Sequence, residues 1–324
     1  MPILGSRAGG AAAGFGFGGG KKGFIEATGG TVSVCGDYKV HAFTGPGTFC
    51  VSYIEPCTPG VVDYLVVAGG GGTTNSSYPG AAGAGGFRES KQPTAPWTAS
   101  PLATSTGITV STSPGGYPVA VGSGGAYDTC SSTPGNPGGT STFGPINATG
   151  GGAGGHGCSG ATTPPFHGQP GGSGGSAGQG NLAARPGGSG NAGGYSPPEG
   201  NSGPGASTSP SNIQVTGGGG GATASGASFG PTTGGAGGAG AGTQISPPSY
   251  GQVCGSYRYF SGGGGGSGTT GGGAGGIGGG QPGWANPQGP ITPLSRNGTG
   301  NTGGGAGARS NGGSGVVIIK YKYK

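Results

Sequence analysis

The stretch VDYLVVAGGGG, residues 62–72, is the first place where residue types and spacing suggest chemistry. A buried strand that runs into a glycine-rich turn cradles a dinucleotide phosphate when a helix follows, because the phosphate sits on the helix N-terminus. The next residues, TTNSSYPGAAGAGG, include a proline and no apolar residues at helical spacing. Glu89 lies near the position of a ribose-binding carboxylate, but GxGxxG matches arise by chance among 95 glycines in 324 residues. We therefore expect no nucleotide site and no cofactor.

The residues that could bind a metal ion or transfer protons are scattered along the chain. His156 and Cys158 are close in sequence, yet no third ligand accompanies them, and the six cysteines form no CxxC pair. Cleavage of a glycan would need two paired carboxylates, whereas Glu89, Asp128 and Glu199 each stand alone in their segments. We expect neither a metal site nor an enzyme.

Aromatic residues on long loops are the remaining candidates, and the chemistry they suggest is adhesion. Tyrosine and tryptophan give a large contact area at low entropic cost, and their rings stack on sugars and protein surfaces. The loops concerned are residues 193–201, 246–260 and 281–290. The candidate receptor-binding residues are Tyr195, Tyr250, Tyr257, Arg258, Tyr259, Phe260 and Trp284. The alternative is that these rings cover the ends of the scaffold or pack on strands.

The composition narrows the class of protein. Glycine and proline together make 95 + 28 = 123 residues, a level that without a collagen period is typical of disorder. Only 6% of the residues are charged, however, which is unlike a disordered chain. The net charge of +6 comes from dispersed Lys and Arg residues, so no basic stripe for nucleic acid is present. No segment approaches the roughly 20 apolar residues of a membrane span, and the first residues lack the apolar region of a secretory signal.

Several glycine runs repeat with a period of three residues. In residues 151–157, 171–176, 234–240 and 272–279, two glycines are followed by one residue with a side chain. A polyproline-II-type helix has three residues per turn, so every side chain falls on one edge and two edges stay bare. Such a helix makes no internal hydrogen bonds and has to pair with neighbouring helices. Collagen is excluded, because it has one glycine in three rather than two.

These patterns predict a mainly β fold combined with a bundle of polyglycine-II helices and essentially no α-helix. Strand-length apolar segments such as TVSV, TFCVSYI and DYLVVA lie near both ends of the chain. We expect an irregular attachment arm at 1–23, a β-rich region at 24–125, a polyglycine-helix sandwich with loops at 126–315 and a closing strand at 316–324 that caps the bundle. Local disulfides are sterically compatible with the spacing of Cys50 with Cys57 and of Cys130 with Cys158.

Six segments with specific sequences occur in order along residues 24–324: IEATGGTVSVCGDYKVHAFTGPGTF, VDYLVVAGGGG, GAGGFRES, YPVAVGSGG, STFGPINATGGGAGG and GGSGVVIIKYKYK. This series resembles the glycine-rich structural proteins of tailed bacteriophages, particularly marine ones. The resemblance implies a tail-fibre or appendage protein on the outside of the virion. Its partners would be other virion proteins, through the N-terminal region, and a glycan or outer-membrane protein of the host surface. Tip adhesins of some long tail fibres have a similar polyglycine sandwich and carry host specificity on loops.

Three non-enzymatic roles remain open at this point. The first is a host-binding adhesin, and the second is a structural fibre or capsid-decorating protein with inert loops. The third, ice binding, is suggested by a likeness to the glycine-helix bundles of springtail antifreeze proteins. Ice binding is disfavoured because the third positions vary among Ala, Ser, His and Ile instead of forming a regular face. The sequence leaves the oligomeric state and the receptor open.

Overall fold

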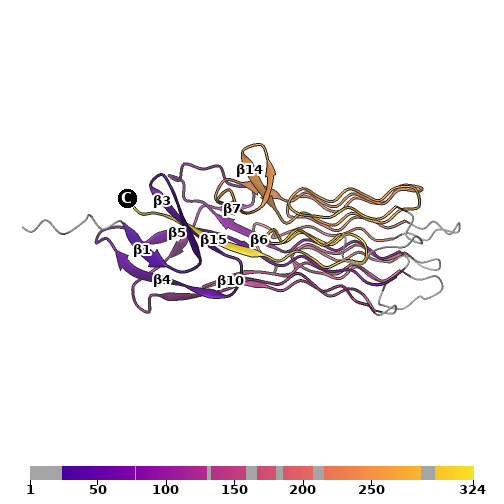
Figure 1. The fold of residues 1–324 in the computed structure, drawn as a ribbon, viewed down its shortest axis with the longest axis horizontal. Coiled ribbons are helices and arrows are strands. Elements are labelled where there is room, and N and C mark those ends of the chain that lie inside the picture. Colours follow the sequence, from indigo (N-terminus) through magenta and orange to yellow (C-terminus); the bar gives the residue numbers. More distant parts are fainter. Residues whose placement is uncertain are drawn as a thin grey trace, which may run out of the picture.

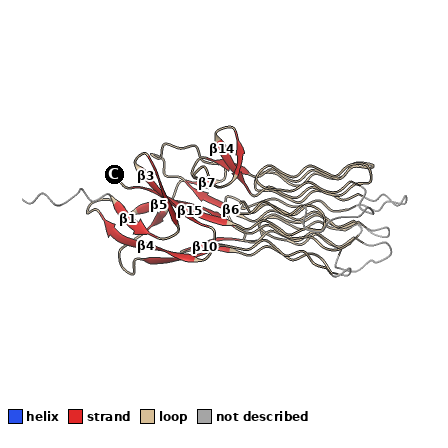
Figure 2. Ribbon diagram, viewed as in Figure 1, coloured by secondary structure: helices blue, strands red, loops and turns tan. Residues whose placement is uncertain are grey.

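The protein is described by a computed structural model over residues 24–76, 78–129, 133–157, 166–179, 185–206, 215–285 and 296–324. Within these ranges the fold is all-β, without any helix and hence without a helix that could span a membrane. The molecule is elongated, with the strands gathered toward one end and glycine-rich segments running side by side along the long axis toward the other (Figure 1). Figure 2 shows the same division between strands and non-strand segments. We call these ends the β end and the distal end.

The fifteen strands of the described residues form three sheets. The five-stranded sheet has the order β1-β4-β9-β10-β11, the seven-stranded sheet the order β2-β3-β15-β5-β6-β7 with β8 beside β5, and the small sheet the order β12-β14-β13. All neighbours are antiparallel except the parallel pair β6 and β7. The strands are β1 Ile25–Thr28, β2 Thr31–Cys35, β3 Tyr38–Phe43, β4 Gly47–Ile54, β5 Val61–Val67, β6 Phe87–Ser90, β7 Ala103–Thr104, β8 Ile108–Thr109, β9 Gly116–Ala120, β10 Ser141–Phe143, β11 Ile146–Ala148, β12 Ala241–Thr243, β13 Gln252–Cys254, β14 Tyr257–Phe260 and β15 Val316–Lys322.

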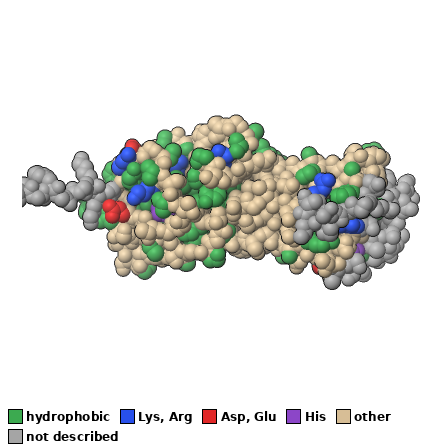
Figure 3. Space-filling view, in the orientation of Figure 1, with side chains coloured by type: hydrophobic (Ala, Val, Ile, Leu, Met, Phe, Trp, Pro, Cys, Tyr) green, Lys and Arg blue, Asp and Glu red, His purple; other side chains and the backbone are tan. Residues whose placement is uncertain are grey.

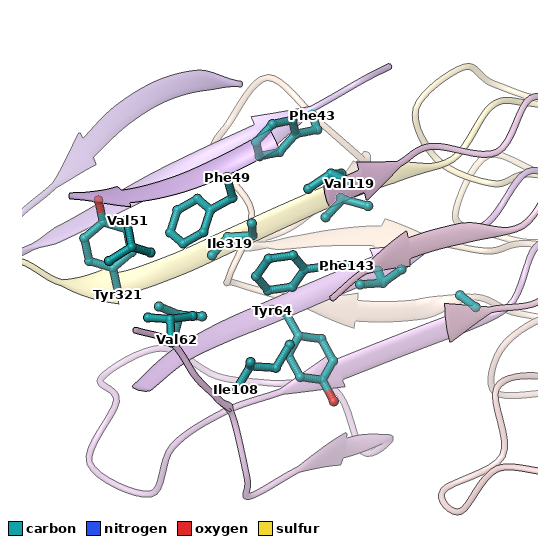
Figure 4. Packing of buried hydrophobic residues seen from close by; sticks show 14 of the residues in the cluster. Phe43, Phe49, Val51, Val62, Tyr64, Ile108, Val119, Phe143, Ile319 and Tyr321 are labelled. Carbon is teal, nitrogen blue, oxygen red and sulfur yellow. The ribbon is translucent and has the colours of Figure 1, made fainter. Parts of the chain in front are cut away.

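A hydrophobic core joins the two larger sheets at the β end. Phe49 of β4 and Phe143 of β10 meet Ile319 and Tyr321 of β15 and Tyr64 of β5 (Figure 4). The Phe49 and Phe143 rings meet edge to face at 5.9 Å between centroids, and Phe49 meets Tyr321 at 6.0 Å. Edge-to-face contacts of this kind add to the free energy gained from burial alone. The core therefore fixes the sheets against each other and gives the glycine segments a rigid base.

Strand β15 lies in the centre of the seven-stranded sheet and is buried on both faces. It pairs with β3 on one side and β5 on the other. The closing strand expected at 316–324 is present as Val316–Lys322, and it lies between two other strands, where an apolar VVII segment gains most from burial. The expected alternation is present, since Ile319 and Tyr321 face the first core whereas Lys320 faces away from it. The Lys320 ammonium lies 4.1 Å from the Trp97 ring centroid, and burial lowers the Lys320 pKa.

The glycine segments are direct continuations of the strands. Residues 68–74 continue β5, residues 261–268 continue β14, and residues 311–315 lead into β15. Residues 80–86, which precede the boundary predicted at residue 126, already bond to glycine segments that follow it, as Gly83 does to Gly152 and Ala84 to Gly220. Conversely, β10 and β11, which follow that boundary, belong to the five-stranded sheet. The same stretches of chain thus form strands toward one end of the molecule and glycine segments toward the other.

Hydrogen bonds between glycine segments follow a period of three residues. In the segment 215–222 the amide of every third residue donates to the same neighbour, residues 261–267, while the amides one position before two of these residues donate to residues 224–227. Gly220 donates to a third segment, at Gly174. The donor and acceptor pairs are Thr216 with Ser267, Gly219 with Gly264, Ala222 with Ser261, Gly218 with Ala227, and Gly221 with Ala224. Successive amides therefore point toward different neighbours, whereas those of a β-strand alternate between two sides.

These bonds require backbones that approach more closely than a side chain allows. A Cβ added to Gly219 would lie 1.9 Å from the carbonyl oxygen of Ala82, and one added to Gly71 would lie 2.2 Å from that of Gly152. No real Cβ tolerates such distances, so these positions accept only glycine. Small side chains occur at the other positions, as with buried Ser173, Ser176 and Ala177.

A buried carboxylate links the small sheet to the seven-stranded sheet. Glu89 of β6 accepts hydrogen bonds from the Ser100 amide at 2.9 Å and from the Thr243 hydroxyl of β12 at 2.5 Å. Its side chain is almost fully buried, and desolvation raises its pKa above the ordinary value. Burial thus stabilises the neutral acid relative to a carboxyl group in water.

We predict that Gly238→Val lowers the free energy of unfolding by at least about 2 kcal/mol, because overpacking against backbone has no simple relief. Its Cβ would lie 2.1 Å from the Ala224 oxygen and 2.5 Å from the Gly221 nitrogen. The matched control is Ala236→Val, which adds to an exposed side chain and should change stability by less than about 0.5 kcal/mol. Equal losses in chemical unfolding of the two variants would contradict the close-approach account.

We predict that Glu89→Gln reduces the pH dependence of stability. A carboxyl whose pKa is raised on folding binds more protons in the folded than in the unfolded state, so its contribution falls as pH rises above about 4.5. Denaturant unfolding from pH 4 to 7 should show the wild type losing stability relative to the variant over that interval. Asp63, whose pKa is also raised, is present in both proteins, and its charge adds to the upward shift of the Glu89 pKa. Parallel curves would show that Glu89 does not titrate in this way.

Candidate functional site

The small sheet presents the aromatic cluster expected from residues 246–260. Gly255, at φ +59°, and Ser256 form the turn between β13 and β14, and Tyr257 lies opposite Cys254. Tyr257 and Tyr259 share one face of β14 because strand side chains alternate, and their ring centroids are 6.4 Å apart. Both rings are half-buried. This sheet rises from the flank of the molecule, about midway along the long axis and beside the start of the glycine segments (Figure 1).

Tyr259 is held against the neighbouring strand. A Cβ on Gly242 of β12 would come within 2.7 Å of the Tyr259 ring, so the ring lies directly over the glycine. Arg258 points to the other face, opposite Thr243 and the exposed Val253. On the Tyr257 face the accessible part of this candidate surface therefore consists of Tyr257 and the edge of Tyr259, while Val253 is exposed on the Arg258 face.

Two predicted contact residues do not face solvent as expected. Phe260 is completely buried in a second core, together with Leu65, Ile318 and Ile245, so its assignment to the receptor-binding set was wrong. The sequence reads YRYF, and alternation alone places Phe260 on the Arg258 face, where the small sheet packs on the seven-stranded sheet. Tyr250 is half-buried and packs against the same core. Both side chains stabilise the small sheet.

Tyr195 belongs to the β end and lies apart from the other candidates. Its ring covers the Arg88 guanidinium of β6 at 3.8 Å from the centroid. Its amide donates to the Asn191 side chain at 3.1 Å, and the Asn191 side-chain amide donates back to its carbonyl at 3.0 Å. Glu199 of the same loop is buried and accepts from the Thr149 amide at 2.8 Å. Here the ring covers an end of the scaffold, which was the alternative left open by the sequence.

Trp284 lies at the opposite end, where the glycine segments reverse direction. The Arg296 guanidinium is 5.2 Å from the centre of its indole ring, and Arg296 Nη1 donates to the carbonyl oxygens of Gly283 at 2.7 Å and Pro282 at 3.1 Å. The Trp284 carbonyl accepts from the Gly268 amide of the neighbouring segment at 2.8 Å. Both Trp284 and Arg296 are partly exposed.

Two further arginines at the distal end were not singled out from the sequence. Arg185 is buried, stacks on Phe166 at 4.2 Å and donates to the Gln179 carbonyl at 2.6 Å. Arg309 donates from Nε to the Ser76 carbonyl at 3.0 Å. Gln179 in turn bonds to Tyr78, two residues beyond Ser76, so these contacts form one connected region. Charged residues are rare in this chain, so an arginine between two glycine runs is the sequence signal that could have indicated a role at a turn.

We define the distal turns as the described residues that carry these contacts: Ser76, Tyr78, Asp128, Phe166, Gln179, Arg185, Trp284, Arg296 and Arg309. Asp128 belongs here because it pairs with Thr74, the last residue of the segment that continues β5. Basic side chains occur at both ends of the molecule, while backbone and small polar atoms dominate the middle (Figure 3). With three arginines and one aspartate, the described distal turns carry a formal charge of 3 − 1 = +2.

The carboxylates that a glycosidase would need are used structurally. Glu89 and Glu199 are buried and accept backbone amides, and Asp128 lies at the distal turns. In the described part of the chain no three His, Cys, Asp or Glu side chains form a group that could hold a metal ion. A hollow of about 220 Å³ at the β end is lined partly by Tyr38, Asp63 and Lys322. The Asp63 carboxylate there already accepts from Ser90 and Gln92.

The disulfide that the spacing allowed between Cys50 and Cys57 is not formed. Both are free and exposed, as are Cys35 and Cys254. Cys50 lies within β4, which continues to Ile54 and carries the chain away at about 3.3 Å per residue. Cysteines whose Cα atoms are more than about 7 Å apart cannot be bridged without backbone movement. Cys130 and Cys158 lie outside the described residues.

Comparison with protein families matches residues 43–322 to a model described as a glycine-rich domain. The match extends from the last residue of β3 to the last residue of β15 and includes every glycine segment described above. No curated protein and no solved structure matches the chain.

We predict that a thiol-alkylating reagent modifies Cys50 and Cys57 in the native protein without prior reduction. Both side chains are exposed free thiols, so they should react at rates similar to exposed Cys254, which serves as the internal reference. Peptide mass spectrometry measures the modification. Recovery of a Cys50–Cys57 disulfide peptide would restore the expectation drawn from the sequence.

Proposed function

The chain belongs to the glycine-rich domain family, and from this premise we propose that it is an external appendage protein of a tailed-phage virion that binds the host surface through its distal turns. The observation that carries the proposal is the separation of the two ends of the molecule. The amide of Phe24 donates to the carbonyl of Tyr323 at 3.0 Å, so the described chain starts and finishes at the β end. The distal turns lie at the other end of the long axis (Figure 1).

This arrangement suits a protein that is attached at one end and makes contacts at the other. Phe24, the first described residue, lies at the β end, and we place the contact with other virion proteins there. The resemblance of the sequence to phage glycine-rich structural proteins supports the virion location.

We take the glycine segments to be polyglycine-II helices, the scaffold type of the tail-fibre tip adhesins that the sequence resembles. Their hydrogen bonds to one neighbouring segment recur at every third residue, which agrees with a helix of three residues per turn. A lattice that is bonded in several directions holds its turns in fixed relative positions, and binding then costs little ordering entropy. The scaffold thus supplies rigidity, and specificity is left to the turns.

Trp284 and Arg296 are the described residues that best fit a glycan of the host envelope. A partly exposed indole can stack on a sugar face, and a guanidinium pre-oriented beside it can meet acidic groups. Arg296 is held by two backbone carbonyls, so its position is set before a ligand arrives. The Tyr257 surface of the small sheet is the second site of this kind, but it lies on the flank, about midway along the molecule and away from the distal turns (Figure 1).

A purely structural fibre protein is the rival function, and one observation favours it. Each distal arginine donates to backbone carbonyls of its own chain, which closes the open end of the lattice without any external partner. If the protein is a structural fibre, the aromatic rings at the distal turns only cover the arginines.

The test compares particles that carry Trp284→Ala with particles that carry Tyr257→Ala. Both changes remove one partly exposed ring, so Tyr257→Ala is the matched control. Mass spectrometry of purified particles first establishes that the chain is present. We predict that Trp284→Ala slows adsorption to host cells by roughly tenfold or more, as expected for an anchoring aromatic residue, whereas Tyr257→Ala does not.

Separate arms of the assay identify the receptor class. Periodate oxidation of host cells destroys glycans, and protease treatment removes outer-membrane proteins; the proposal predicts loss of adsorption with periodate. Adsorption of Trp284→Ala particles at the wild-type rate would favour the structural fibre, and loss with Tyr257→Ala alone would move the site to the small sheet.

A further inference from the structure

Strand β2 is an edge strand that lacks the usual protection of a sheet edge. It pairs with β3 on one side and is the first strand of the seven-stranded sheet. Its five residues, TVSVC, include no charge and no proline. Val32 and Val34 are 48% and 58% exposed, and they are two of the four exposed large apolar side chains of the described residues. Natural sheets protect such edges with Lys, Pro or bulges, because an open edge pairs readily with another strand.

We propose that β2 pairs with β2 of a second copy of this chain, antiparallel and centred on Ser33, so that two seven-stranded sheets join edge to edge. A two-fold axis through Ser33 places Val32 opposite Val34 of the second copy and Thr31 opposite Cys35 of the second copy. This inference concerns the β end and does not rest on the virion role.

The five-residue sequence is complementary to itself in this register. One face gains two valine pairs, and the other face has the small polar residues Thr31, Ser33 and Cys35. Cross-strand pairs of β-branched side chains stabilise a sheet, and like charges directly opposite each other destabilise it. Since β2 has no charged residue, the symmetric pairing meets no repulsion at any of its five positions. A two-fold contact of this kind is closed and produces a dimer rather than a filament.

The ends of β2 also leave room for a second chain. Gly30 precedes it at φ +61° and Gly36 follows it at φ +59°, so the chain turns away at both ends and limits the contact to the strand. Neither glycine has a side chain, and a Cβ at Gly36 would meet nothing within 4 Å. The approach to the edge of β2 is thus unobstructed by its own flanking residues.

Charges on the adjacent strand do not oppose the pairing. Lys39 lies opposite Val34 and His41 opposite Val32. The two-fold axis sets Lys39 in line with His41 of the second copy, three strand spacings away, or about 14 Å. That distance exceeds the Debye length of about 8 Å at physiological ionic strength. His41 is buried, its pKa is lowered by desolvation, and it bonds to the Gly29 carbonyl and the Tyr321 hydroxyl, so it is uncharged at neutral pH.

Disulfide cross-linking tests the register directly. In a variant without cysteines, single cysteines are placed at positions 31, 33 and 35 by Thr31→Cys, by Ser33→Cys and by retaining Cys35. Only position 33 lies opposite itself, with Cβ atoms about 5 Å apart, so only Ser33→Cys should give a dimer under mild oxidation. An equimolar mixture of the position-31 and position-35 proteins should form a disulfide between them, while neither protein alone should form a disulfide-linked dimer.

A charge variant supplies the second measurement. Val32→Lys with Val34→Lys, in the Ser33→Cys protein, places lysines opposite each other and should slow dimer formation by at least about tenfold. Both valine positions are exposed, so we expect this variant to fold normally. An unchanged thermal unfolding midpoint verifies that. Equal cross-linking at all three positions, its absence at position 33, or indifference to the lysines would overturn the proposal. A contact of β2 with a different protein would give the second of these results.

Discussion

The buried N–H groups of the described glycine segments find their acceptors on other segments, as Gly219 does on Gly264 and Gly220 on Gly174. A buried amide left without a partner costs about 1–3 kcal/mol, and a bond that is made contributes only about 0.5–1.5 kcal/mol. Ordering glycine costs a further 0.5–1 kcal/mol or so per residue relative to alanine. A single segment therefore cannot be stable by itself. Only a lattice in which nearly every amide and carbonyl is used can offset these costs.

The absence of Cβ atoms is what makes the lattice geometrically feasible, and the sheets provide its alignment. Each segment that continues a strand inherits its position from a sheet that is already fixed by side-chain packing, as Phe49, Phe143 and Tyr321 show. The sheets set the positions of the glycine segments through β5, β14 and β15, which are continuous with residues 68–74, 261–268 and 311–315. At the other end the arginines donate to carbonyl groups at the turns, as Arg185 and Arg296 do. A hydrophobic core at one end and charge-assisted caps at the other thus enclose a middle with few large side chains.

Much of this arrangement could be predicted from local sequence pattern. The period of three in the glycine runs predicts bonding in several directions, and the alternation in VVIIKYK predicts which side of β15 meets which core. Long-range pairing could not be predicted, because no local pattern tells that β15 enters the sheet between β3 and β5. Phe260 was misplaced for the same reason, since its burial depends on the small sheet packing against Leu65 and Ile318. Cys50 and Cys57 are close in sequence, but the extended path of β4 separates them. Of the candidate site residues, Trp284 was found as an aromatic loop residue, whereas the arginine that orients it became evident only from the fold.

The most direct measurement of the central claim is amide hydrogen exchange of the glycine segments, resolved by residue. Gly219 donates to Gly264, Gly220 to Gly174 and Gly263 to Gly238, so their amides should exchange as slowly as those of β15 in the sheet core. Successive amides donate to three different neighbouring segments, and all of them should be protected. Protection should therefore not alternate from one residue to the next. Exchange of these amides at rates close to those of an unfolded chain, with β15 still protected, would contradict the account of a lattice joined by bonds between glycine segments.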